Sequence, residues 1–206
     1  MQRYIWDPFV RLFHWSLAIA FGVAFYTHAS EWDRMTHIQA GYVAGGLIIA
    51  RIIWGTVATG YANFKTFPPN IIWAAKYLYK LIQGNAKHYV GHNPTGALVI
   101  YAMLGIGLIA VGSGILVFED GLIFGDAYID AYKTIHHYAT WGWLILVGGH
   151  VIGVLTESVL HRDNLILAMI TGCKRVCKIK PKQKKQLLQA KHELAYKKMQ
   201  ATKQSH

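Results

Sequence analysis

The stretch that decides the fold runs from Lys133 to Arg162, KTIHHYATWGWLILVGGHVIGVLTESVLHR. Residues 138–149 within it carry no formal charge, and a membrane-spanning helix needs roughly 20 mostly apolar residues. Histidine is costly in contact with lipid, so histidines within a span indicate a function and a partner. His136 and His150 are separated by about 21 Å of helical rise and return to within about 40° of one face. Each therefore needs a partner at its own depth in the membrane.

Other apolar stretches of the chain are also long enough to span a membrane. The predicted spans, in addition to the stretch above, are Phe9–Thr27, Ile38–Val57 and Gly96–Phe118. An alternative for the first is a cleaved signal peptide, with Arg3 and Arg11 as its charged region. The expected fold class is all-α, an integral membrane four-helix bundle.

The ends and connections of these spans carry helix signals of their own. Asp7-Pro8 and Asn93-Pro94 are typical helix starts, with proline at the first helical position. The longest connection, 59–93, contains Ile71–Ile82, where apolar residues alternate with lysines at helical spacing. We predict an amphipathic helix lying on the membrane surface there, the alternative being a linker helix packed on a partner.

The third span has no histidine but is rich in glycine. Such a density of glycine lets another helix, or a flat cofactor, approach the backbone closely, and helix packing alone is the simpler alternative. The glycines are Gly96, Gly105, Gly107, Gly112 and Gly114.

The charge of the chain is concentrated at its C-terminal end. Residues 173–206 carry 11 Lys and Arg against one acid, whereas residues 1–172 carry 10 basic and 9 acidic side chains. We therefore expect a four-span domain at 1–172 and a basic tail at 173–206. Beside a membrane domain such a tail favours anionic lipid over nucleic acid. Cys173 and Cys177 lie in this tail and fit a reducing cytoplasm better than a disulfide framework.

The distribution of Lys and Arg also predicts the orientation. The N-terminal end, the 59–93 connection and the tail hold nearly all of them, and the opposite loops hold Arg34 and Lys133 alone. The positive-inside rule then places both termini in the cytoplasm. The acidic loop predicted at 119–130 faces the other compartment, where it is either a docking surface for a basic electron carrier such as cytochrome c or a plain solvated loop.

With this topology two pairs of histidines match in depth. The outer pair is His37 with His136, and the inner pair is His14 with His150, which matches less tightly. His137 competes with His136 but is turned well away from the shared face. A structural zinc site needs ligands at one point, whereas these pairs lie about 20 Å apart. Facing imidazoles fit bis-histidine axial ligation of haem, which favours electron transfer.

Arginines near the cytoplasmic face complete this prediction. Arg11, Arg51 and Arg162 are placed to pair with the propionates of an inner haem. The alternative for each is that its side chain reaches the lipid headgroups.

Several segments resemble the bacterial cytochrome b561 family over about residues 3–175. Within that family the chain is most similar to the branch of the b-type subunits of nickel–iron hydrogenases. The segments are WDPFVRLFHW (6–15), HIQAGYVAGGLIIARIIWG (37–55), YVGHNPTGA (89–97), HHYATWGWLILVGGH (136–150) and HRDNLILAMITG (161–172).

The resemblance implies a four-helix membrane cytochrome with two b haems whose ligands are His14, His37, His136 and His150. It also implies electron transfer in the bacterial inner membrane between the quinone pool and a redox partner protein, such as a hydrogenase-like or dehydrogenase subunit. Candidate quinone contacts are His28, Glu31 and Asp33 on the outer side and Arg11, Arg51 and His161 on the inner side, the alternative for each being a loop or interface residue that binds no quinone. The alternatives are a stand-alone superoxide:quinone oxidoreductase and a non-haem transporter lined by histidines.

Overall fold

The computed structural model describes residues 2–123 and 128–175. Its elements, in chain order, are β1 (Gln2–Tyr4), α1 (Pro8–Thr27), α2 (Arg34–Val57), the 3-10 turns η1 (Gly60–Ala62) and η2 (Phe64–Thr66), α3 (Ile71–Ile82), α4 (Pro94–Ile123), α5 (Ile129–His161), α6 (Leu165–Thr171) and β2 (Cys173–Arg175). Predictions about residues 176–206, Cys177 included, lie outside the described residues.

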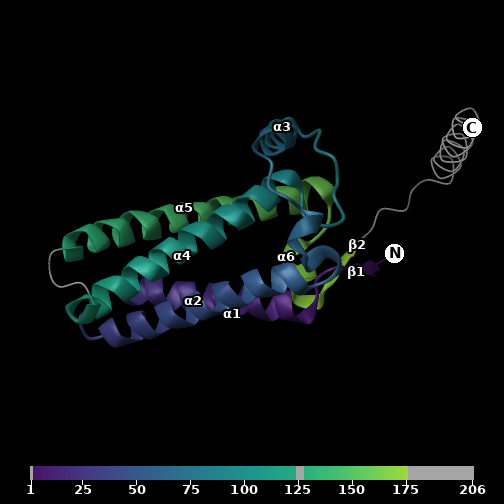
Figure 1. The fold of residues 1–206 in the computed structure, drawn as a ribbon. Helices are drawn as coiled ribbons and strands as arrows, with labels where there is room; N and C mark the ends of the chain where they lie inside the picture. The colour runs from purple at the N-terminus through teal and green to yellow at the C-terminus, as the bar shows by residue number, and fades with distance from the viewer. Residues whose placement is uncertain (1, 124–127, 176–206) are drawn as a thin grey trace, which may run out of the picture. The chain divides into compact units, whose positions relative to one another are not determined.

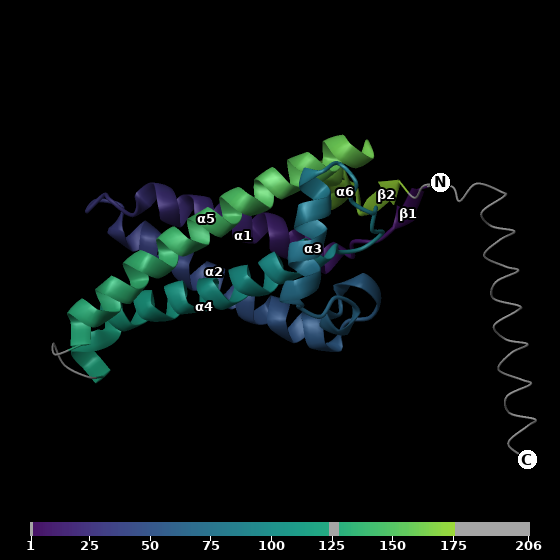
Figure 2. The same cartoon turned by 90° about the horizontal axis from the view of Figure 1, so that it is seen from above.

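Four helices, α1, α2, α4 and α5, are long and apolar enough to cross a membrane. Helix α1 packs along α2, α4 packs along α5, and α2 contacts α4, which joins the two helix pairs into a bundle (Figures 1 and 2). The predicted all-helical bundle with four spans is confirmed. Helices α1 and α4 begin, and α2 and α5 end, at the end of the bundle where α3 lies (Figure 1). We call this end the α3 end.

The helix starts follow from the capping residues. Asp7 Oδ1 accepts a hydrogen bond from the backbone N–H of Val10 at 2.8 Å, and Asn93 Oδ1 accepts one from Gly96 at 2.6 Å. Each cap satisfies a backbone donor that the first turn leaves without a helical partner. Both predicted helix starts are confirmed.

The helices extend beyond the apolar runs that predicted them. Helix α2 begins at Arg34, and α4 continues to Ile123. Helix α5 begins at Ile129. Part of the predicted acidic loop 119–130 is therefore helical, because a helix does not have to end where its apolar sequence ends.

The connection between α2 and α4 contains the predicted helix with its predicted bounds, Ile71–Ile82. Helix α3 packs against α4 and buries Ala74 and Tyr77. Most of its other large apolar residues are exposed, including Ile72 and Trp73. That distribution matches the predicted amphipathic helix, and its place on a membrane surface stays a prediction.

A strand pair and a short helix at the α3 end were not predicted. Strand β1 pairs with β2, and the backbone N–H groups of Ile5 and Trp6 donate to the carbonyl of Gly172 at 2.8 and 3.2 Å. Gly172 has φ +83°, and a Cβ there would lie 2.9 Å from the carbonyl oxygen of Trp6. Glycine is therefore required at this close approach.

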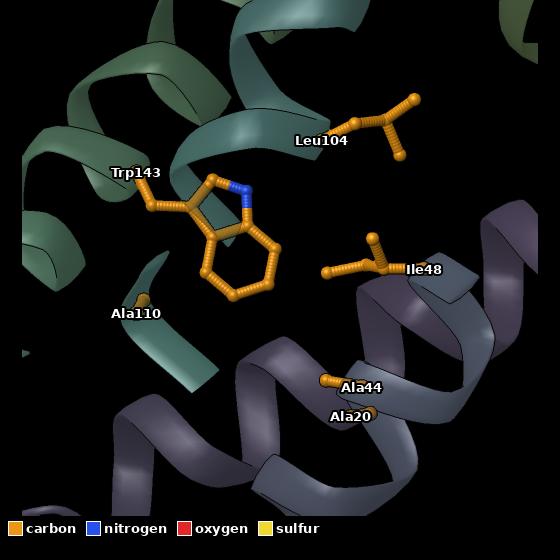
Figure 3. Close-up of a cluster of buried hydrophobic side chains, with 6 residues drawn as sticks. All are labelled: Ala20, Ala44, Ile48, Leu104, Ala110 and Trp143. Carbon is orange, nitrogen blue, oxygen red and sulfur yellow. The ribbon is translucent and has the colours of Figure 1, made fainter. Parts of the chain in front are cut away.

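The core of the bundle lies at mid-length between the helices. Figure 3 shows the indole of Trp143 from α5 pointing toward Ile48 of α2 and Leu104 of α4. Gly107 makes room for the indole, because a Cβ there would meet Trp143 at 2.9 Å and Ile48 at 2.8 Å. The predicted role of some α4 glycines in close packing is confirmed at this position.

Candidate functional site

The outer pair of histidines faces across the bundle. The ring centroids of His37 on α2 and His136 on α5 are 6.1 Å apart, and the ring planes are 86° apart. His37 Nδ1 lies 2.8 Å from the carbonyl oxygen of Ala24, and His136 Nδ1 lies 2.8 Å from that of Ala110. Because a carbonyl only accepts, each Nδ1 carries the proton, which leaves Nε2 of the neutral ring free to bind a metal.

The inner pair has a similar separation. The ring centroids of His14 on α1 and His150 on α5 are 6.2 Å apart. The Nδ1 atom of His14 is buried and has no hydrogen-bond partner within the described part of the chain. No carbonyl of the described chain therefore orients the His14 ring in the way that those of Ala24 and Ala110 orient the outer pair. The weaker depth match expected for this pair is not seen in the ring separation.

Both separations fit an iron atom placed between the rings. A metal–nitrogen bond to imidazole is about 2.0 Å, so with half a ring added on each side the centroids of two coaxial ligands lie about 6 Å apart. No cluster of three or more His, Cys, Asp or Glu side chains with metal-binding geometry occurs among residues 2–123 and 128–175. Two imidazoles fill only two positions of a metal ion, so each pair suits a cofactor that supplies the remaining ligands itself, as haem does.

The space beside the pairs also suits a flat cofactor. Gly41 and Gly153 lie one helical turn after His37 and His150, respectively, and a Cβ on either glycine would meet no heavy atom within 4 Å. A Cβ on Gly114, by contrast, would lie 2.9 Å from Cε1 of His136. The described chain therefore leaves open space next to Gly41 and Gly153, and Gly114 permits close packing of α4 against His136.

The two pairs are separated by the apolar core. Trp143 lies midway between His136 and His150 on α5, seven residues from each, which is about two turns of one helix face. Its side chain is 5 % exposed, and its ring contacts that of Phe21 at a centroid distance of 4.9 Å. Electrons moving between the pairs would cross this packed layer.

The predicted propionate partners lie at the α3 end. Arg51 is 3 % exposed, its Nη2 donates to the carbonyl of Ala62 at 3.1 Å, and its Nη1 is buried without a partner in the described chain. The guanidinium also lies over the ring of Phe64, 4.7 Å from its centroid. Arg11 donates from Nη1 to the carbonyl of Ile170 at 2.6 Å, and its Nε is buried without a partner there.

Other side chains singled out in the sequence lie away from the pairs. His137 is exposed, as the helical phase predicted, and packs beside Tyr138 and Trp141. The outer-side candidates for quinone contacts lie at the end opposite α3 and are exposed; they are His28, Glu31 and Asp33. Arg162 ends α5 with φ +51° and is also exposed.

Sequence reasoning missed His92, which lines a pocket at the α3 end. The pocket has a volume of about 280 Å³ and is also lined by Tyr61, Phe67 and Tyr89. The ring of His92 lies 4.1 Å from that of Phe67 and 4.7 Å from that of Trp6, centroid to centroid. Burial, followed by the positive charges of Arg51 and Lys174, lowers the pKa of His92 to about 3. The sequence feature that could have identified His92 is its place in an aromatic loop, directly before the capping residue Asn93.

Comparison with known proteins identifies the family. Residues 5–172 match the family model described as prokaryotic cytochrome b561. The chain is 23% identical to the probable Ni/Fe-hydrogenase B-type cytochrome subunit of Azotobacter vinelandii over 82% of this chain and 87% of the relative. The corresponding protein of Bradyrhizobium diazoefficiens is 25% identical, over 82% of this chain and 84% of its own length.

The chain is also 20% identical to the probable Ni/Fe-hydrogenase 1 B-type cytochrome subunit of Escherichia coli K12, over 84% of this chain and 90% of the relative. No solved structure matches the chain significantly. The family match covers nearly all of the four-span body. The chain therefore belongs to the prokaryotic cytochrome b561 family and is a multi-pass membrane cytochrome of the b type that carries electrons.

Proposed function

We propose that this protein moves electrons across the bilayer through two b haems. His37 and His136 hold the outer haem, and His14 and His150 hold the inner one. The observation that carries the proposal is the presence of two imidazole pairs with ring separations of 6.1 and 6.2 Å, each joining α5 to a different helix. When bound, haem supplies an iron that accepts and releases one electron, and two imidazole ligands leave no open position for oxygen.

The protein's own residues set the conditions for that transfer. The carbonyls of Ala24 and Ala110 orient the outer imidazoles through Nδ1, which makes the ring a stronger donor to a metal. Arg51 and Arg11 each present a buried nitrogen that has no partner among the described residues, and we assign these two side chains to the propionates of the inner haem. Trp143 and its apolar neighbours exclude water between the pairs.

The orientation we propose places the α3 end in the cytoplasm. Lysines and arginines outnumber acids in the connection 59–93 and in the tail 173–206, and the positive-inside rule then puts both termini on that side of the bacterial inner membrane. We retain the division into a di-haem domain at 1–172 and a basic cytoplasmic tail at 173–206. The tail binds anionic lipid through its charge.

We place the quinone at the α3 end, in the pocket beside His92. A quinone head group needs an apolar slot with a few polar groups and access from the membrane. Tyr61, Phe67 and Tyr89 supply aromatic walls, and His92 supplies a neutral imidazole. The candidates at the opposite end, Glu31 and Asp33, are exposed.

The redox partner we propose is a hydrogenase-like subunit that docks beside the outer haem. The names of the relatives describe them as subunits of Ni/Fe-hydrogenases. The outer pair lies near the end opposite α3, so that a partner on that face is closest to His37 and His136. A cytochrome c or a dehydrogenase subunit would use the same face and the same route.

The test is a haem-to-protein ratio by pyridine haemochrome on detergent-purified protein, together with a reduced-minus-oxidised spectrum. We expect two b haems for each chain and a low-spin spectrum, with reduction by a short-chain quinol. One haem for each chain would mean that one pair is wrong. No haem, in folded protein made with an adequate haem supply, would overturn the proposal and favour a non-haem transporter.

A further inference from the structure

Glu157 lies near the C-terminal end of α5, at the α3 end of the bundle, and is not used to hold haem. Its Oε1 accepts hydrogen bonds from the hydroxyl of Tyr77 on α3 and from Nδ2 of Asn93 at 2.7 Å. The residue is partly buried. An acid within a membrane span is rare and usually marks a proton or ion path. Glu157 therefore calls for an explanation beyond electron transfer.

The hydrogen bonds alone do not require an acid at this position. Both contacts are donated to one oxygen of Glu157, and the amide oxygen of a glutamine would accept them equally well. A glutamine would also avoid the cost of a charge near the membrane. The two hydrogen bonds therefore do not explain why this side chain is able to bind and release a proton.

Other titratable groups lie at the same end of the bundle as Glu157. His88 lies 3.8 Å from Asp163, and its ring centroid is 4.9 Å from that of His161. Lys174 is 4 % exposed and donates to the carbonyl of Tyr89 at 2.8 Å. Burial lowers the pKa values of His88 and Lys174, and the charges of Glu157 and Asp163 oppose that shift, so both side chains lie within electrostatic range of Glu157.

The net effect on His88 leaves it able to relay a proton. Burial, then the charges of Lys174 and His161, lowers the pKa of His88 below its usual value. Imidazole is the side chain that most readily accepts and releases a proton near physiological pH. The side chain of His88 is 22% exposed, so it lies between water and the less exposed groups. We call Glu157, His88, His161, Asp163 and Lys174 the cluster.

The cluster also reaches the pocket. The ring of Tyr77 contacts that of Tyr89, with centroids 5.5 Å apart, and Tyr89 lines the pocket. Asn93, the second donor to Glu157, directly follows His92, which lines it too. Burial, then the bond to Glu157, raises the pKa of Tyr77, so its hydroxyl stays protonated and keeps donating to the carboxylate.

We propose that Glu157 is the relay residue that supplies protons to, and takes them from, a quinone in the pocket beside His92. This inference rests on the proposed quinone reaction. Reduction of a quinone adds two electrons and two protons to its carbonyl oxygens and forms two O–H bonds. The electrons come from the reduced haems, whose irons are oxidised, and the protons pass through Glu157, which regains them from water by way of His88. Quinol oxidation runs the same steps in reverse.

The experiment compares two electron acceptors on the haem-loaded protein in lipid nanodiscs. The reduced protein is mixed with a short-chain naphthoquinone, which needs protons, or with ferricyanide, which takes electrons alone, and haem absorbance is followed. Glu157→Gln keeps the hydrogen bonds and removes the proton. We expect it to slow oxidation by the quinone about tenfold or more and to leave oxidation by ferricyanide unchanged. Glu157→Asp, which keeps an ionisable group, should restore much of the rate.

Two results would overturn the inference. Glu157→Gln could be oxidised by the quinone as fast as the wild type, or its oxidation by both acceptors could be slowed equally. Either result would mean that Glu157 acts only as a structural clamp, which holds its neighbours through hydrogen bonds. If Glu157→Gln does not assemble with haem, Tyr77→Phe decides, because it removes a clamp contact but keeps the acid. The relay predicts that Tyr77→Phe still reacts with quinone, and the clamp predicts that it also fails to assemble. A wild type that reacts with ferricyanide and not with quinone would instead overturn the proposed function.

Discussion

A Cβ on Gly114 of α4 would lie 2.9 Å from Cε1 and 3.1 Å from Nδ1 of His136 on α5. The imidazole is thus held between the backbone of α4 on one side and the facing ring of His37, 6.1 Å away, on the other. Its Nδ1 is also fixed by the carbonyl of Ala110, one turn before Gly114 on the same helix. Helix α4 carries no ligand itself, yet it sets the position of one.

Replacing Gly114 with alanine should therefore disturb the outer haem. Alanine is favoured over glycine inside a helix by roughly 1 kcal/mol, so loss of helix stability is not the expected cause. The added methyl group would displace the His136 ring from its place against α4, toward His37, and we expect a loss of about half the haem or a clear change of its low-spin spectrum. Pyridine haemochrome analysis and the reduced spectrum measure both.

Gly105→Ala is the matched control for this prediction. It makes the same change on the same helix, where a Cβ would meet no heavy atom within 4 Å. Equal haem content and equal spectra in the Gly114 and Gly105 variants would contradict the close contact with His136.

Substitution of single histidines should separate the two sites. We expect His37→Ala to remove the outer haem and spare the inner, and His150→Ala to do the opposite, because each haem needs both of its axial ligands for low-spin iron. Haem content should fall by about half in each variant. The adjacent His137, exposed on the other face of α5, is the control, and His137→Ala should keep the full content. A loss of all haem from every variant would indicate global unfolding instead.

Trp143 should stabilise the layer between the two pairs. Truncation of a buried aromatic residue to alanine costs about 3–5 kcal/mol, and Trp143 is 5 % exposed. We expect Trp143→Ala to lower the midpoint of thermal unfolding, measured by haem absorbance in detergent, while Trp143→Phe changes it much less. Trp141 is 48% exposed on the same helix, so Trp141→Ala is the control. Similar effects of the two alanine variants would argue against a packed layer at Trp143.

The elements that the sequence predicts well are those that depend on local order. The four spans, the α3 helix at Ile71–Ile82 and the caps at Asp7 and Asn93 follow from hydropathy, helical period and side chains that bond their own helix start. The matching depths of the histidines follow from the rise of a helix. The structure brings the rings of both pairs together, and their ligation of haem stays a prediction.

The features that sequence reasoning missed depend on contacts between distant residues. Strand β1 pairs with β2 from the other end of the chain, and helix α6 precedes β2. Glu157 acquires its role only when α3 brings Tyr77 beside it. No local pattern distinguishes an acid that is enclosed by another helix from one that reaches the headgroup region, so a single sequence could not identify this cluster.

The stability of the protein should depend on pH through His92. Its pKa in the folded state is about 3, against 6.5 for an unperturbed histidine, chiefly because of burial. Between these values the unfolded chain binds a proton that the folded protein does not, so the free energy of unfolding falls as pH is lowered through this range. We expect a loss of up to a few kcal/mol, because each pKa unit corresponds to about 1.4 kcal/mol.

His92→Gln should reduce that dependence, because glutamine has no proton to bind. Thermal unfolding in detergent at about pH 7.5 and about pH 5 measures it, and the wild type should lose more stability over this interval than the variant does. Other groups titrate in the same range, so the difference between the two proteins is the relevant quantity. Exposed His137, changed to Gln, serves as the control and should follow the wild type. If His92→Gln also follows the wild type, then His92 is hydrated in the folded protein and does not line a dry quinone pocket.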